Sequence, residues 1–111
     1  MPQPPSGTVS FLFTDLEGST RLWEEQPDAM RSALGVHDEL LRQAIEAHGG
    51  YVFSTAGDAF AAAFGRAADA VGAAVDGQRA LHSERWPGGI LLRVRMGIHT
   101  GEAVERDGDY F

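Results

Sequence analysis

Apolar residues in the first half of the chain form one continuous run and one helical stripe. The run Val9–Thr14 predicts a buried strand. A short helix is expected after it, with Leu22 and Trp23 as its apolar anchors. A longer helix is predicted from Pro27 to a glycine cap at 48–50, because apolar residues recur on one helical face: Met30, Leu34, Leu41, Ala44 and Ile45.

The second half of the chain predicts a hairpin, a helix and an alternating strand. Tyr51–Phe53 and Phe60–Phe64 predict two short strands that are joined by a tight connection at 54–58. An alanine-rich helix is expected over Arg66–Glu84. Ile90–Ile98 alternates between apolar and polar residues, which is typical of a half-exposed strand.

The order of these elements is β-α-β-β-α-β, which predicts an α+β fold. The expected architecture is a ferredoxin-like split βαββαβ sandwich, with helices packed on a mainly antiparallel sheet. His99-Thr100-Gly101 is expected to break the last strand. The Pro-rich residues 1–7 are expected to form a disordered tail before a single domain at 8–111. Arg93 and Arg95 are expected to stabilise the sheet edge.

This topology predicts that two distant aspartates are neighbours. In a right-handed split βαβ unit the first two strands are parallel, so the hairpin after the second strand lies at the end of the first. Asp15 and Asp58 should therefore lie close together. Two close carboxylates repel each other, and a hard cation such as Mg²⁺ relieves that repulsion. The simpler alternative is that both are turn residues without a metal.

Composition narrows the classes of function. The chain has 111 residues, enough for one domain, and its net charge of −7 disfavours general DNA or RNA binding. It has no cysteine for a disulfide or a thiolate metal site, and no lysine for a phosphate-binding loop. No apolar run approaches the roughly 18 residues that suggest a membrane span. The N-terminus lacks a secretory signal pattern, so a cytoplasmic location is expected.

Three motifs resemble the class III adenylyl/guanylyl cyclase catalytic domain over residues 8–111, in the family's order and with similar spacing. They are Phe11-Leu12-Phe13-Thr14-Asp15-Leu16-Glu17-Gly18-Ser19-Thr20, Gly57-Asp58-Ala59-Phe60 and Arg95-Met96-Gly97-Ile98-His99-Thr100-Gly101-Glu102. The resemblance implies an enzyme that converts ATP to cyclic AMP and pyrophosphate with two Mg²⁺ or Mn²⁺ ions. It also implies a homodimer with active sites at the interface.

The same resemblance implies roles for individual residues. Asp15 and Asp58 would bind both metal ions, and the carbonyl of Leu16 would add a ligand to one ion. The following residues would cover the β- and γ-phosphates: Glu17, Gly18, Ser19 and Thr20. Ser54 and Asp109 match the two positions that recognise the purine.

The chain departs from the family pattern at two points. Ser54 stands where adenylyl cyclases have lysine and guanylyl cyclases glutamate, so GTP could fit as well as ATP. The family's transition-state asparagine and arginine lie beyond Asp109-Tyr110-Phe111, so the domain is expected to lack its C-terminal part. An alternative is a weak or inactive cyclase-homology domain that binds nucleotide or a partner and regulates an attached module. A generic ferredoxin-like interaction module is the third hypothesis.

Overall fold

The computed structural model describes residues 4–111 and contains an antiparallel four-stranded sheet with helices packed on it. In chain order the elements are β1 Gly7–Leu16, α1 Ser19–Glu25, α2 Pro27–Ala47, β2 Tyr51–Ala56, β3 Ala59–Phe64, α3 Ala67–Ser83, the 3₁₀ turn η1 Pro87–Gly89, β4 Val94–Ala103, β5 Glu105–Arg106 and β6 Asp109–Tyr110. The sheet order is β2-β3-β1-β4. Since β3 is antiparallel to both β1 and β2, those two strands run in the same direction. The predicted ferredoxin-like fold is confirmed.

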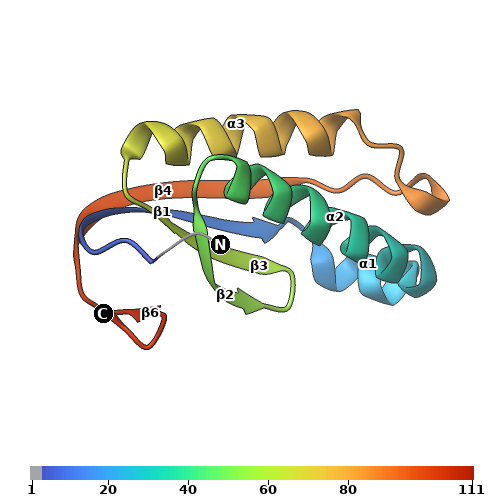
Figure 1. The fold of residues 1–111 in the computed structure, drawn as a ribbon. Coiled ribbons are helices and arrows are strands. Elements are labelled where there is room, and N and C mark those ends of the chain that lie inside the picture. The colour runs from blue at the N-terminus through green and yellow to red at the C-terminus, as the bar shows by residue number, and fades with distance from the viewer. Residues whose placement is uncertain (1–3) are drawn as a thin grey trace.

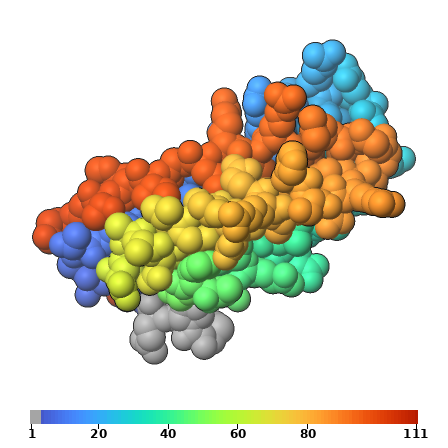
Figure 2. Space-filling model, turned by 90° about the horizontal axis from the view of Figure 1, so that it is seen from above, coloured from blue at the N-terminus to red at the C-terminus, as the bar shows by residue number. Residues whose placement is uncertain are grey.

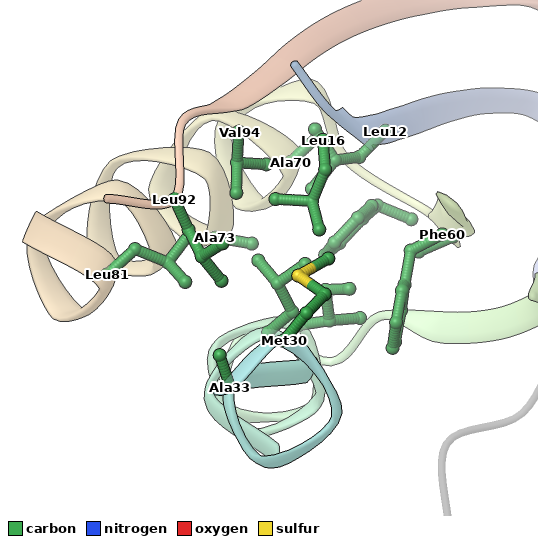
Figure 3. Packing of buried hydrophobic residues seen from close by; sticks show 14 of the residues in the cluster. Leu12, Leu16, Met30, Ala33, Phe60, Ala70, Ala73, Leu81, Leu92 and Val94 are labelled. Carbon is green, nitrogen blue, oxygen red and sulfur yellow. The ribbon is translucent and has the colours of Figure 1, made fainter. Parts of the chain in front are cut away.

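The main core lies between the sheet and the two long helices, which cover one face of the sheet (Figure 1). Side chains alternate across a strand, so Leu12 and Leu16 of β1 point to the helix side. There they meet Met30 of α2 together with Ala70 and Ala73 of α3 (Figure 3). Small alanines on α3 let that helix lie close to the sheet, and Figure 2 shows the molecule from the side that α3 covers.

The opposite face of the sheet carries an aromatic cluster. The ring of Phe11 on β1 lies 5.8 Å from that of Phe53 and 5.2 Å from that of Tyr110, in edge-to-face geometry. Tyr110 belongs to the small β5–β6 hairpin, and its hydroxyl donates a hydrogen bond to the carbonyl of Pro5 at 2.7 Å. Burial raises the pKa of Tyr110 to about 12, with smaller effects from Glu105 and Tyr51. The hairpin is thus anchored to this face.

The last long strand differs from its prediction at both ends. The segment before Val94 is not in the sheet, because Val94 already pairs with Leu16, the last residue of β1. Ile90 and Leu92 are nevertheless buried, so their apolar pattern reflects the core and not strand pairing. The predicted break at His99-Thr100-Gly101 is wrong, since β4 continues to Ala103 opposite the early residues of β1.

The N-terminal segment is partly included in the fold. Of the predicted tail, residues 1–3 lie outside the described residues, and Gly7 is the first residue of β1. None of the helices within residues 4–111 is long and apolar enough to cross a membrane.

Candidate active site

The end of β1 and the β2–β3 turn are held together by two hydrogen bonds. The Leu16 amide donates to Asp58 Oδ1 at 3.2 Å, and the Phe60 amide donates to Thr14 Oγ1 at 3.3 Å. Asp15 lies between Thr14 and Leu16, and Asp58 lies in the turn between β2 and β3. Strand β3 pairs with β1, so the topology places Asp58 at the end of β1 that carries Asp15.

Arg95 of β4 makes a bidentate ion pair with Asp15. Its Nε donates to Oδ1 at 2.8 Å and its Nη2 donates to Oδ2 at 2.9 Å. Hydrogen bonding to Asp15 and the negative charge of that carboxylate raise the pKa of Arg95, with smaller effects from Glu17 and Asp58. Sequence reasoning placed Arg95 only at a sheet edge and missed this contact. The contact follows from the strand register of the structure, in which Asp15 and Arg95 are directly opposed in the β1–β4 ladder.

A groove of about 500 Å³ lies beside this pair, with Asp15, Ser54 and Arg95 among its lining residues. Phe13 also lines it, between Ala61 on one neighbouring strand and Gly97 on the other. Because these two neighbours are small, the sheet surface is hollow on both sides of the Phe13 ring. The groove therefore combines an apolar floor with one charged edge, a common design for ligand sites.

A β-bulge brings Ser54 to the groove. The β2–β3 register shifts between Val52 and Ser54, so Phe53 is the extra residue. In a regular strand Phe53 and Ser54 would point to opposite faces. Here the ring of Phe53 packs against Phe11 on the sheet face that the helices do not cover, and Ser54 lines the groove on the same face.

The predicted phosphate-binding segment forms the turn from β1 into α1. Gly18 has a φ of +68°, in the left-handed region that favours glycine, and the helix begins at Ser19. The Glu17 amide donates to the carbonyl of Arg93 at 2.9 Å, so it already has a partner. Ser19 is half-buried and Thr20 is exposed. Residues 17–20 directly follow Asp15 and Leu16 in the chain. Asp15 lines the groove, whereas residues 17–20 do not.

Asp109 is separate from the other predicted site residues. It lies in the β5–β6 hairpin, and its Oδ1 accepts a hydrogen bond from the Tyr110 amide at 2.8 Å. This hairpin follows Ala103, which pairs with Gly7 at the start of β1, far from the Asp15 end (Figure 1). Asp109 is not among the residues that line the groove. The structure therefore brings Asp15, Asp58 and Ser54 to one region and leaves Asp109 outside it.

The donor set at the aspartates fits a magnesium-type ion. Two carboxylates and a backbone carbonyl are hard oxygen ligands, and Mg²⁺ in proteins often uses only one or two carboxylates together with phosphates and water. Within residues 4–111 no group of three or more His, Cys, Asp or Glu side chains is placed to hold a metal.

Comparison with known proteins identifies the family. The model of the adenylate and guanylate cyclase catalytic domain matches residues 1–107. The chain belongs to this family. An adenylate cyclase of Neurospora crassa is 37% identical over 94% of the chain, and an uncharacterized protein of Mycobacterium tuberculosis is 42% identical over 94%.

A solved cyclase structure has the same fold. The structure of adenylate cyclases from Trypanosoma brucei in their monomeric state has a TM-score of 0.86 and 28% sequence identity, covering 99% of this chain and 66% of that one. The chain spans only 5% of the Neurospora protein and 35% of the mycobacterial protein. The cyclase fold is therefore shown for this domain.

Proposed function

We propose that residues 8–111 form a nucleotide cyclase domain that converts ATP to cyclic AMP and pyrophosphate in cyclic nucleotide signalling. The main support is the hydrogen bond of 3.2 Å from the Leu16 amide to Asp58 Oδ1, which holds Asp58 beside the Asp15 end of β1. Two relatives whose names say adenylate cyclase, from Neurospora crassa and Trypanosoma brucei, favour ATP as the substrate. A dimer of this domain in the cytoplasm is part of the proposal.

In the proposed reaction the 3′-oxygen of the nucleotide bonds to its own α-phosphorus. The bond from that phosphorus to pyrophosphate breaks, and the hydroxyl proton is released. Asp15, Asp58 and the Leu16 carbonyl would hold Mg²⁺ or Mn²⁺. When bound, such ions would acidify the attacking hydroxyl and neutralise the triphosphate.

The chain's own part in this chemistry is positioning. Asp58 is already oriented by the Leu16 amide, so its carboxylate needs little reorganisation when a ligand arrives. Phosphoryl transfer depends mainly on positioning and charge neutralisation; the carboxylates would provide the positioning, and the cations that they hold would provide the neutralisation. Residues 17–20 would approach the outer phosphates from the turn that follows.

Base recognition is the second part of the proposal. The Ser54 hydroxyl at the groove can donate or accept a hydrogen bond, so it can pair with adenine or guanine, and GTP is proposed as a weaker substrate. Asp109 lies outside the groove. Recognition of the purine by Asp109 would need a second copy of the domain or a rearrangement of the β5–β6 hairpin.

The test measures binding and product in the same samples. The protein is incubated with ATP or GTP and Mn²⁺, with calorimetry for affinity and chromatography for the cyclic product. We expect product from the wild type and none from Asp15→Asn or Asp58→Asn. Glu24→Gln removes an equal charge from the exposed surface of α1 and should change nothing.

The outcomes separate the competing functions. Binding without product in the wild type would favour a regulatory cyclase-homology domain. Neither binding nor product would refute every nucleotide-dependent function and favour a generic interaction module.

A further inference from the structure

The Asp15 carboxylate, a metal ligand in the proposed function, is already engaged by a cation. Arg95 donates to Oδ1 at 2.8 Å and to Oδ2 at 2.9 Å. Such fork-shaped pairs are among the strongest charge-assisted hydrogen bonds. Each oxygen keeps a further lone pair, but a divalent cation that used it would lie within a few ångströms of the guanidinium. Arg95 therefore opposes the binding of a second cation at Asp15.

The sheet itself defines this pair. Asp15 and Arg95 are opposed in the antiparallel β1–β4 ladder, and both line the groove. Opposed residues have Cβ atoms about 4.5–5.5 Å apart, so the two side chains meet without a change in the backbone. In the part of the chain that the structure describes, Arg95 is the only cationic residue in the lining of this groove.

The charge balance at this end of the sheet depends on the same guanidinium. Arg95 interacts with the negative charges of Glu17 and Asp58 in addition to that of Asp15. Close carboxylates repel each other, and a neighbouring positive charge offsets that repulsion. Arg95 thus takes the electrostatic place that a metal ion would otherwise fill.

We propose that Arg95 is the resting counter-ion of Asp15 and sets the divalent-cation concentration at which the site fills. This rests on the proposed function, because it takes Asp15 as a metal ligand. The Arg95 and Asp15 side chains are 65% and 46% exposed, so solvent screens the pair and it can open without unfolding the domain. Removing one positive charge so close to a divalent ion should tighten binding about three- to tenfold in a screened aqueous site.

The test uses Mn²⁺ alone as the probe, with free ion measured by electron paramagnetic resonance. Arg95→Gln is expected to bind Mn²⁺ about three- to tenfold more tightly than the wild type. Arg93→Gln removes the same charge two positions earlier and keeps the Asp15 ion pair, so its affinity should match the wild type. Circular dichroism confirms that each variant is folded. Added salt should reduce the difference between Arg95→Gln and the wild type.

A further variant separates the two proposals. If Asp15→Asn loses Mn²⁺ binding while Arg95→Gln and wild type bind equally, the counter-ion role is refuted and the proposed function stands. Weaker binding by Arg95→Gln would also refute the counter-ion role. If no variant binds Mn²⁺, with or without ATP, both proposals are refuted.

Discussion

A buried hydroxyl joins strand β1, which carries Asp15, to strand β3, which follows the turn that carries Asp58. Thr14 is 4% exposed, and its Oγ1 accepts the hydrogen bond from the Phe60 amide. Phe60 is 3% exposed, so its amide has little access to water if this acceptor is removed. Thr14→Val preserves the shape of the side chain and removes the hydroxyl. The substitution therefore isolates the contribution of one hydrogen bond.

The size of the effect follows from the lost hydrogen bond. Phe60 also pairs with Thr14 in the β1–β3 ladder, so the substitution removes one intramolecular hydrogen bond, worth about 0.5–1.5 kcal/mol, and valine suits a strand as well as threonine. For a domain of this size 1 kcal/mol corresponds to roughly 4 °C, so Tm should fall by about 2–6 °C. Thr14→Ser keeps the acceptor and loses one methyl group, at a cost of about 1 kcal/mol.

Urea unfolding followed by the fluorescence of Trp23 and Trp86 measures the three proteins. We expect the midpoint to fall in both variants, by loss of the hydrogen bond in Thr14→Val and by loss of the methyl group in Thr14→Ser, with an unchanged slope. Thr14→Val should also weaken the binding of Mn²⁺ with ATP, because the bond fixes the β2–β3 turn against β1. A Thr14→Val protein as stable as the wild type would show that the hydroxyl does not satisfy the Phe60 amide.

Three further predictions concern other parts of the molecule. Asp15→Asn should abolish cyclic nucleotide formation and shift the free energy of unfolding by less than about 1 kcal/mol, as urea unfolding would show, because its ion pair is exposed. Gly35→Ala should stabilise α2 by about 0.5–1 kcal/mol, since a Cβ there meets no atom within 4 Å. Gly72→Ala in α3 should not be stabilising, because the added Cβ would lie 2.6 Å from His48 Cε1. Equal stabilisation of the Gly35→Ala and Gly72→Ala proteins in urea unfolding would contradict this prediction. Tyr110 is neutral when protonated and its pKa is raised from 10.0 to about 12, so its stabilising effect is complete below pH 10 and lost as the pH rises through 12. The free energy of unfolding, measured between pH 10 and 12, should depend less on pH in Tyr110→Phe than in the wild type. The same pH dependence in both proteins would show that Tyr110 is not the group responsible.

The sequence was sufficient for the fold and for the placement of the β2–β3 turn, which carries Asp58, beside the end of β1. Apolar runs and stripes depend only on local periodicity, and their order selects a split βαβ topology. That topology predicts that the β2–β3 turn lies beside the end of β1, and the bond from the Leu16 amide to Asp58 agrees with it. No detail of side-chain geometry was needed for this step.

Features that depend on strand register could not be predicted. The ends of β4 are set by the length of β1, its pairing partner, and not by the residues of β4 itself. The bulge at Phe53 changes which face Ser54 points to, and no glycine or other local signal marks it. The contact between Asp15 and Arg95 likewise requires the β1–β4 register, which hydrophobic alternation alone does not fix.

Folding does not require a glycine at position 97, on the sheet face opposite the helices. Gly97 has no positive φ, and a Cβ added there would meet no atom within 4 Å, so the fold would accept a larger residue at this position. Its small size keeps the space beside Phe13 open, and Ala61 does the same on the other side. Farther along the same face, Phe11 and Tyr110 pack closely and leave less room. Since packing does not require a glycine at position 97, the open groove beside Asp15 is consistent with selection for a bound molecule.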